Sequence, residues 1–176
     1  MSPRVTWKSL SARAGRNDMP ALLADAIIND VLSPDELAKG IADTWTMAEW
    51  PARVIDPTSW STIFAMAIDE HEFITDDGLI VSSNTIPESL VLYRGAFEEF
   101  ALGMSWTSDL ATARWFARRF NGTRDNPEGH VYTITAERSA VIGRFDARRE
   151  LEFVLDVTVL FDDDVKMVAD VDSVVA

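Results

Sequence analysis

The hydrophobic positions in the first half of the chain repeat with the period of an α-helix. Apolar side chains recur every three or four residues between residues 20 and 49, and the segment SPDEL (33–37) adds a serine cap followed by proline in the first turn. Pro51 predicts the end of that second helix, because proline cannot continue one. A third helix is predicted from about residue 59 to residue 72, and a turn signal follows at residues 76–78.

The pattern changes after residue 85, where β-branched and aromatic residues come in short runs with partial alternation. Such runs indicate strands, and the predicted strands are residues 89–95, 130–137, 140–145 and 151–161. One amphipathic helix is predicted between them, at about residues 109–120, with Asn121-Gly122 as its C-cap. Helices followed mostly by strands predict an α+β fold, with an N-terminal helical lobe and a largely antiparallel β core.

The length of 176 residues predicts one domain, which we divide into four sections. The sections are a basic arm (1–18), a helical lobe (19–85), a β-rich core (86–165) and an acidic tail (166–176). We expect the arm and the tail to be solvated, as charged ends commonly are. The alternative is an arm that docks on a partner or on the acidic tail of the same chain.

The composition excludes several kinds of site. The chain has no cysteine and two histidines, so disulfides, thiol catalysis, zinc–thiolate centres and histidine-rich metal sites are ruled out, and we expect no metal. The net charge of −13 opposes the binding of a phosphate backbone, so a nucleic-acid partner is not expected. No apolar run is long enough for a membrane span, and the N-terminus has no apolar signal core, so we expect a cytoplasmic protein with no membrane partner, in the producing cell or a target cell.

Arg94 ends the first predicted strand, in the segment SLVLYRG (89–95). Period two places it on one face with two buried leucines. A buried arginine needs an anion, and its planar fork suits phosphate or carboxylate. An arginine that reaches water or pairs with Glu98 or Glu99 is the simpler interpretation of this position taken alone.

The stretch GMSWTSDLATARWFA (103–117) sets three hydroxyl residues against the start of a helix. Thr107 or Ser108 is expected to cap that helix. Ser105 is then not needed for capping. Side chains alternate along a strand, so Ser105 is expected on the same side as Thr107, with Trp106 on the other side. Polar residues in an ordinary loop explain the stretch equally simply if it stands alone.

Glu150 and Glu152 stand two positions apart at the start of the last long predicted strand. Period two puts both carboxylates on one face, and Leu151 on the core face. Like charges side by side are destabilising unless they serve a function or are neutralised. Arg148 and Arg149 can neutralise these two carboxylates. Paired carboxylates are also the usual groups that cleave glycosidic bonds through oxocarbenium-like transition states.

In this order, the three features resemble the mono-ADP-ribosyltransferases of the Arg-Ser-Glu class, which includes many bacterial toxins. The aromatic-Arg strand end of that family corresponds to LYRG, the Ser-Thr-Ser motif with its helix to SWTSDLATARWFA, and the Glu-x-Glu junction to RRELEFVLD. The resemblance covers about residues 89–161, and the helical first half fits the family only in layout. Trp106 and Thr107 depart from the Ser-Thr-Ser pattern, whereas its first serine is present as Ser105.

The resemblance implies an ADP-ribosyltransferase fold, with NAD⁺ as the substrate and cleavage of its nicotinamide–ribose bond. Arg94 is then expected to bind the pyrophosphate, and the backbone of Gly95 to contact the nicotinamide amide. Ser105 is expected to hold Glu152, which would bind the ribose hydroxyl and stabilise the cationic sugar. Thr107 belongs to the same NAD⁺-binding set.

The resemblance also assigns the acceptor side of the site. Glu150 is expected to orient and deprotonate the acceptor, and a glutamate at this position goes with arginine acceptors in the family. Phe145 is the candidate for the loop aromatic residue that contacts the acceptor.

Trp45 and Trp115 are assigned to the core, because each lies beside apolar positions of a predicted helix. The arginines near Trp115 are expected to be solvated or to attract an anionic ligand, and the loop at residues 121–130 to cover the nicotinamide.

Three functions stay open at this point. The first is an ADP-ribosyltransferase that modifies a protein of unknown identity, on arginine. The second is an NAD⁺ glycohydrolase that uses the same site with water as the acceptor. The third is a catalytically idle phage or bacterial effector that binds and inhibits a partner protein. The complete set of Arg94, Ser105, Glu150 and Glu152 favours the enzymatic interpretations.

Overall fold

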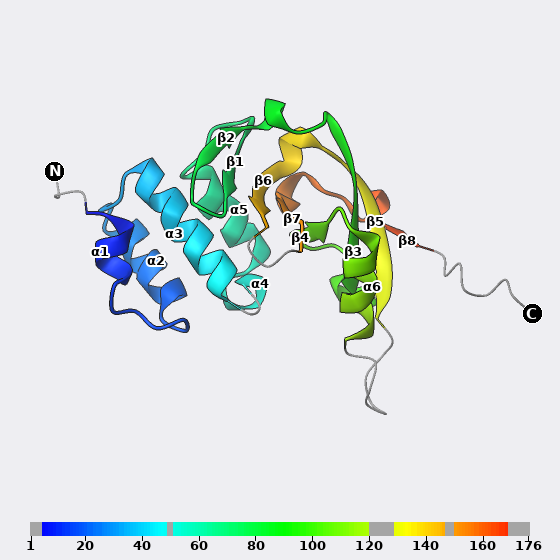
Figure 1. The fold of residues 1–176 in the computed structure, drawn as a ribbon, viewed down its shortest axis with the longest axis horizontal. Coiled ribbons are helices and arrows are strands. Elements are labelled where there is room, and N and C mark those ends of the chain that lie inside the picture. Colours follow the sequence, from blue (N-terminus) through cyan, green and yellow to red (C-terminus); the bar gives the residue numbers. More distant parts are fainter. Residues whose placement is uncertain (1–4, 49–50, 120–128, 147–149, 169–176) are drawn as a thin grey trace, which may run out of the picture.

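A computed structural model describes residues 5–48, 51–119, 129–146 and 150–168 (Figure 1). The helices are α1 (Trp7–Ser11), α2 (Met19–Ile28), α3 (Pro34–Met47), α4 (Pro51–Val54), α5 (Pro57–Ala65) and α6 (Leu110–Arg118). The strands are β1 (Glu72–Thr75), β2 (Ile80–Ser82), β3 (Ser89–Ala96), β4 (Ser105–Thr107), β5 (His130–Glu137), β6 (Val141–Phe145), β7 (Glu152–Leu155) and β8 (Lys166–Met167). Single 3₁₀ turns are η1 (Ser83–Thr85), η2 (Glu98–Phe100), η3 (Arg138–Ala140), η4 (Val157–Val159) and η5 (Asp162–Asp164).

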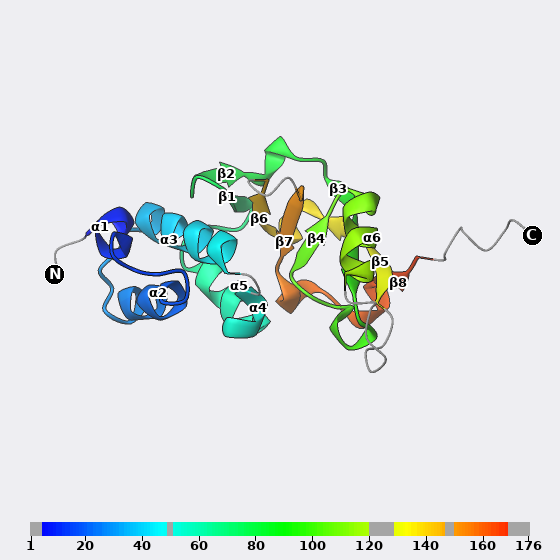
Figure 2. The ribbon, with the colours of Figure 1, turned by 60° about the horizontal axis from the view of Figure 1, so that its bottom comes forward.

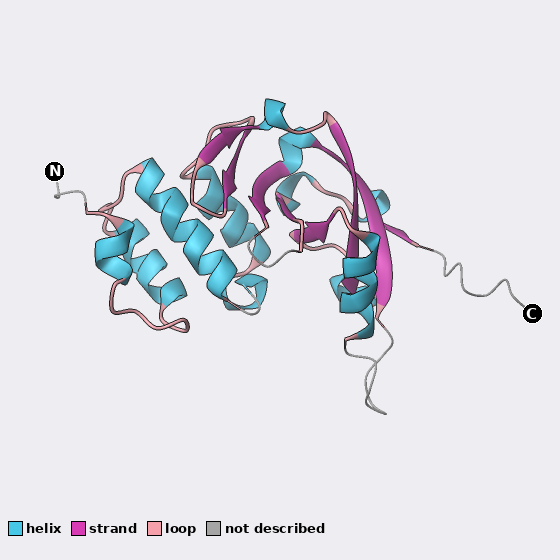
Figure 3. Ribbon diagram, viewed as in Figure 1, coloured by secondary structure: helices cyan, strands magenta, loops and turns pink. Residues whose placement is uncertain are grey.

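Within the described residues, the eight strands form one sheet in the order β2-β1-β6-β7-β4-β3-β5-β8. All neighbouring strands run antiparallel except β1 and β6, which are parallel. The sheet curves strongly, with helices α1 to α5 gathered at one end and α6 packed against β3 at the other (Figures 1 and 3). The predicted α+β class, with a largely antiparallel sheet, is confirmed.

Hydrophobic packing covers both faces of the sheet. Ile74 of β1 and Val154 of β7 belong to a cluster shared with the helical lobe, whereas their neighbours Phe73 and Phe153 belong to a second cluster on the other face. Strands buried on both faces read as continuous apolar runs. This is why the sequence shows only partial alternation in these segments.

The starts of the helices were predicted more accurately than their ends. Ser33 caps α3, and its hydroxyl accepts from the backbone N–H of Glu36, as predicted. However, α3 ends at Met47, and Pro51 begins the short helix α4 instead of ending α3. Proline is favourable at a first helical position because its missing N–H would have no partner there.

The predicted third helix ends earlier than residue 72, and a strand follows at that residue. α5 stops at Ala65, and β1 pairs with β2 across the predicted turn at residues 76–78. β1 also pairs with β6, so the sheet begins at Glu72, inside the predicted helical lobe of residues 19–85. The predicted third helix to residue 72 was therefore wrong at its end, because residues 66–71 form turns and irregular backbone before this strand.

The last predicted strand is also shorter than residues 151–161. β7 ends at Leu155, and the chain then turns into η4. The start of the predicted acidic tail forms β8, which pairs with β5 at the edge of the sheet. The rest of the tail and the predicted Asn121-Gly122 cap lie outside the described residues.

The described part of the basic arm is docked on the helical lobe. The Trp7 side chain is only 2% exposed. Its backbone N–H donates to Glu36 Oε2 at 2.6 Å, and its indole Nε1–H donates to Asp43 Oδ2 at 2.8 Å. A Cβ on Gly40 would lie 3.0 Å from the indole ring, so glycine lets the ring lie directly on α3. The expectation of a solvated arm was wrong for Trp7, which binds acidic side chains of α3. The basic residues Lys8, Arg13 and Arg16 are exposed, as expected.

Replacing Trp7 with alanine is expected to lower the free energy of unfolding by about 3–5 kcal/mol, because a large buried ring is lost. Urea denaturation followed by circular dichroism measures the change. Lys8→Ala is the control, since Lys8 is exposed on the same helix and its loss should cost less than about 0.5 kcal/mol. Similar small costs for both variants would contradict the docking of the arm.

Candidate active site

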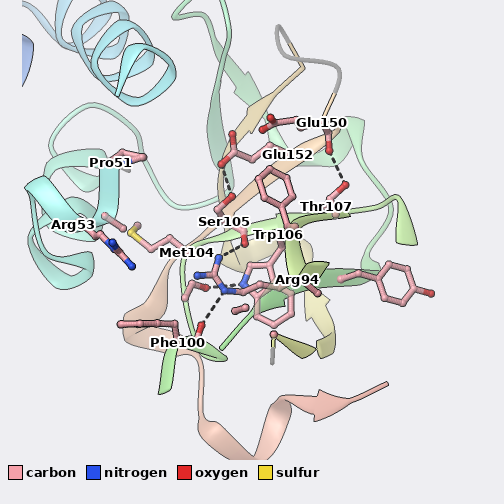
Figure 4. Close-up of a pocket in the computed structure, with 18 of the residues that line it drawn as sticks. Pro51, Arg53, Arg94, Phe100, Met104, Ser105, Trp106, Thr107, Glu150 and Glu152 are labelled. Carbon is pink, nitrogen blue, oxygen red and sulfur yellow. Dashed lines mark hydrogen bonds between the residues drawn. The ribbon is translucent and has the colours of Figure 1, made fainter. Parts of the chain in front are cut away.

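A cavity of about 830 Å³ lies between the helical lobe, the sheet and α6 (Figure 4). Figure 2 shows β7 and β4 side by side between the lobe and α6, and these two adjacent strands contribute four residues to its wall, Ser105, Trp106, Thr107 and Glu152. The residues predicted to bind NAD⁺ and both predicted catalytic glutamates line it: Arg94, Gly95, Ser105, Thr107, Glu150 and Glu152.

Ser105 and Glu152 are in direct contact. The Ser105 hydroxyl donates a hydrogen bond to Glu152 Oε1, with 2.6 Å between the oxygens (Figure 4). β4 pairs with β7 so that Thr107 lies opposite Glu152, and this register places Ser105, Thr107 and Glu152 on one face of the sheet. The predicted contact between residues 47 positions apart is confirmed.

Trp106 lies on the opposite face, as predicted. Its side chain is 1% exposed and belongs to the second hydrophobic cluster. Its indole N–H donates to the carbonyl oxygen of Gly103 at 2.6 Å. The ring therefore anchors the backbone immediately before Ser105.

A second donor reaches Glu152 from the helical lobe. The indole Nε1–H of Trp45 on α3 donates to Glu152 Oε1 at 3.1 Å. The assignment of Trp45 to the core is confirmed, since the ring is 2% exposed, but it misses this contact. A buried indole N–H needs an acceptor, although no local pattern in the sequence identifies one 107 positions away.

Backbone carbonyl groups hold Arg94. Its Nε donates to the carbonyl oxygen of Phe100 at 3.1 Å, and its Nη1 donates to that of Ser105 at 2.6 Å. In the part of the chain that the structure describes, no ion pair joins Arg94 to Glu98 or Glu99. The guanidinium thus ties together the segment that leads into β4.

Arg94 is a half-buried cation. Burial lowers its pKa from the usual value to about 10, while the negative charge of Glu152 acts in the opposite direction. The side chain is therefore still charged at neutral pH. The pairing of Tyr93 with Thr107 places Tyr93 on the face of Ser105, so Arg94 starts from the other face and reaches the cavity at the end of its strand.

Gly103 gives the guanidinium the space it occupies. A Cβ at position 103 would lie 2.7 Å from both Cζ and Nη2 of Arg94. A glycine is needed at position 95 for a different reason. A Cβ there would collide with the backbone of α6 at Ala113 and Ala117. The glycine after Arg94 thus allows α6 to lie close against β3.

The cap of α6 is Asp109, and the prediction of Thr107 or Ser108 was wrong. The Asp109 carboxylate accepts from backbone N–H groups of the first turn and from the Thr112 hydroxyl. The hydrogen bond from the Thr112 hydroxyl, followed by those backbone bonds, lowers the pKa of Asp109 below its usual range. Aspartate has the same capping chemistry as serine and threonine, so the local sequence does not distinguish Asp109 from its two neighbours.

Thr107 instead holds the backbone of Glu150. Its hydroxyl donates to the Glu150 carbonyl oxygen at 2.6 Å and accepts from the backbone N–H of Asp109 at 3.1 Å (Figure 4). Thr107 is buried, and it lines the cavity. The second hydroxyl of the motif therefore positions the first glutamate, as Ser105 contacts the second.

Leu151, between the two glutamates, does not continue the strand. Its φ of +46° is in the left-handed region, which costs a residue with a Cβ about 1–2 kcal/mol. It is 40% exposed, so the prediction that it points into the core was wrong. Glu150 still lines the cavity with Glu152, but this turn places it there, not strand alternation. Arg148 and Arg149 lie outside the described residues.

Two further aromatic assignments were wrong. Phe145 is 3% exposed and stacks on Trp45 with 6.4 Å between ring centroids, so it has no open face for an acceptor. Trp115, predicted to be core, is 57% exposed, with the guanidinium of Arg119 5.3 Å from its ring. The predicted nicotinamide-covering loop lies almost entirely outside the described residues.

The cavity concentrates positive charge in an acidic protein. Four arginines line it, against two acidic residues, although the chain as a whole has a net charge of −13. The arginines are Arg16, Arg53, Arg94 and Arg119. Such a local excess of cations favours an anionic ligand. Among the described residues, no group of acidic residues and histidines is arranged to hold a metal ion, and no helix is both long and apolar enough to cross a membrane.

Neither a family model, nor a curated protein, nor a solved structure matches the chain. The case for a function therefore depends on the side chains that meet in the cavity.

Gly103→Ala is expected to lower the free energy of unfolding by about 1–3 kcal/mol, because the new methyl group displaces the Arg94 guanidinium from its two carbonyl acceptors. Urea denaturation of a double-mutant cycle isolates the cause. In an Arg94→Ala background, the same glycine substitution should cost less than about 0.5 kcal/mol, since nothing remains for the methyl group to displace. An equal cost in both backgrounds would contradict the close contact.

Proposed function

We propose that the protein is a mono-ADP-ribosyltransferase, which cleaves the nicotinamide–ribose bond of NAD⁺ and transfers ADP-ribose to arginine in a protein acceptor. The hydrogen bond from Ser105 to Glu152, inside a cavity that also contains Glu150 and Arg94, carries this proposal. A half-buried serine on a carboxylate, beside a second carboxylate and a cation, is the set of groups that the sequence resemblance requires together.

The cavity suits the size and charge of NAD⁺. Its volume of about 830 Å³ is within the usual range of small-molecule sites. The pyrophosphate of NAD⁺ is a dianion, and the arginines of the lining provide planar donors for its oxygens. Arg94, the most buried of these cations, would bind the pyrophosphate at the end of β3, next to the backbone of Gly95.

Glu152 would act on the ribose. The bond between C1′ and the pyridinium nitrogen breaks, and its electron pair goes to that nitrogen, so nicotinamide leaves as a neutral molecule. C1′ is left with the character of an oxocarbenium ion. The Glu152 carboxylate, held by Ser105, binds the ribose hydroxyl and stabilises the positive charge that develops on the sugar.

Glu150 would act on the acceptor. A nitrogen of the acceptor guanidinium forms the new bond to C1′, and its proton passes to the Glu150 carboxylate. The hydrogen bond between Thr107 and the Glu150 carbonyl oxygen fixes this residue beside Glu152. With water in place of the guanidinium, the same steps give NAD⁺ hydrolysis.

Glu152→Gln is expected to lower the rate of nicotinamide release from NAD⁺ by about 10²- to 10³-fold, because the amide keeps the shape of the side chain and removes its charge. Release is measured by chromatography with purified protein. Glu137→Gln is the matched control, since Glu137 is exposed on β5 and does not line the cavity. Equal rates for wild-type and Glu152→Gln protein would exclude the proposed reaction.

Glu150→Ala is expected to abolish the labelling of protein acceptors by radiolabelled NAD⁺ while nicotinamide release continues, because only the acceptor step needs this carboxylate. The backbone carbonyl that accepts from Thr107 is retained in this variant. Parallel measurement of labelling in a cell lysate and of free nicotinamide separates the two steps. Equal loss of both would contradict separate tasks for the glutamates, and release without any labelling by the wild-type protein would identify a glycohydrolase.

A further inference from the structure

Trp45 lies where the helical lobe meets the sheet, with aromatic rings around it. Phe145 stacks on its indole at 6.4 Å between centroids, with 21° between the ring planes. Trp60 and Phe64 meet it edge-on, at 5.2 Å and 6.0 Å. These neighbours leave the buried ring little freedom to rotate, so the direction of its N–H is set by the packing of the lobe.

This N–H is directed at the carboxylate of Glu152. Trp45 Nε1 and Ser105 Oγ both donate to the same oxygen, Oε1, at 3.1 Å and 2.6 Å. The two donors come from different elements, α3 and β4, which belong to the two walls of the cavity. A single donor leaves a carboxylate free to rotate about that bond, whereas two donors from separate elements restrict both its position and its rotation.

We propose that Trp45 is a positioning residue, which holds the Glu152 carboxylate in the orientation needed at the ribose. This inference rests on the proposed function, in which Glu152 stabilises the charge on the sugar. Electrostatic stabilisation is effective only when the charge is fixed before the reaction, because a mobile carboxylate must first be ordered. The helical lobe thus supplies one of the hydrogen bonds that order the Glu152 carboxylate.

The chain offers a matched control for this interaction. Trp7 is as buried as Trp45, lies in the same lobe, and its indole N–H also donates to a carboxylate, that of Asp43. Neither Trp7 nor Asp43 lines the cavity. Trp45→Phe and Trp7→Phe therefore remove the same kind of hydrogen bond, with similar structural cost, from two places that differ in their distance from the site.

Trp45→Phe is expected to lower kcat for nicotinamide release by about 10- to 100-fold and to leave KM for NAD⁺ within about twofold, because a displaced catalytic group affects the reaction more than binding. Trp7→Phe should keep kcat within about twofold of wild-type. A second comparison uses the Glu152→Gln background, where Trp45→Phe should have no further effect on kcat, since Trp45 acts through the charge of Glu152.

Results of two kinds would overturn the proposal, and the first kind concerns kcat. Results of this kind are an unchanged kcat for Trp45→Phe, an equal loss of kcat for Trp7→Phe, and a full additional loss when Trp45→Phe is combined with Glu152→Gln. A rise in KM at constant kcat would also overturn it, because it would make Trp45 a contact for NAD⁺ and not for Glu152.

The indole signals in a ¹H–¹⁵N NMR spectrum test the contact without any enzymatic activity. The signal that disappears in Trp45→Phe is assigned to Trp45, and it should move in Glu152→Gln, whereas the Trp7 signal should not. A Trp45 signal that stays in place would contradict the hydrogen bond. The two readouts can also disagree. If wild-type protein releases no nicotinamide while the Trp45 signal still moves in Glu152→Gln, the proposed function and the catalytic role of Trp45 are overturned, but the hydrogen bond is confirmed.

Discussion

The antiparallel pairing of β4 with β7 is the constraint on which the site depends. It sets Thr107 opposite Glu152 and brings Ser105 within 2.6 Å of the same glutamate, from segments 47 positions apart. Because side chains alternate along a strand, a shift of the register by one residue would send Ser105 and Glu152 to opposite faces. Trp106, buried on the other face and bonded to Gly103, opposes such a shift from within the core. The packing of one face thus secures the chemistry of the other.

The sequence predicted those parts of the structure that have local signals. The predicted residues of the cavity wall could be identified because each belongs to a short sequence motif. β5 was located from its β-branched residues. The Ser33 cap was equally clear, because a serine before proline has one preferred structural meaning. The order of these local signals along the chain, compared with a family pattern, was enough to predict the contact between Ser105 and Glu152.

The parts that could not be predicted depend on contacts distant in sequence. Nothing near Trp45 indicates that its N–H meets a glutamate 107 positions away, and nothing near Trp7 distinguishes a docked arm from a solvated one. β1 was hidden because both of its faces are buried, which removes the period-two pattern. Leu151 was misplaced because period two assumes an extended backbone, whereas this residue has a positive φ.

The double role of α3 means that the helical lobe is not a separate module. On one side this helix receives Trp7, and on another it presents Trp45 to Glu152, while Val154 and Phe145 of the sheet complete the core of the lobe. A fragment cut at the start of the sheet would contain every residue of the sequence motifs. It would nevertheless expose the apolar wall of β6 and β7 to water and lack the hydrogen bond from Trp45 to the Glu152 carboxylate. The smallest unit with a complete cavity is therefore larger than the motifs suggest, and it includes the arm, whose Arg16 lines that cavity.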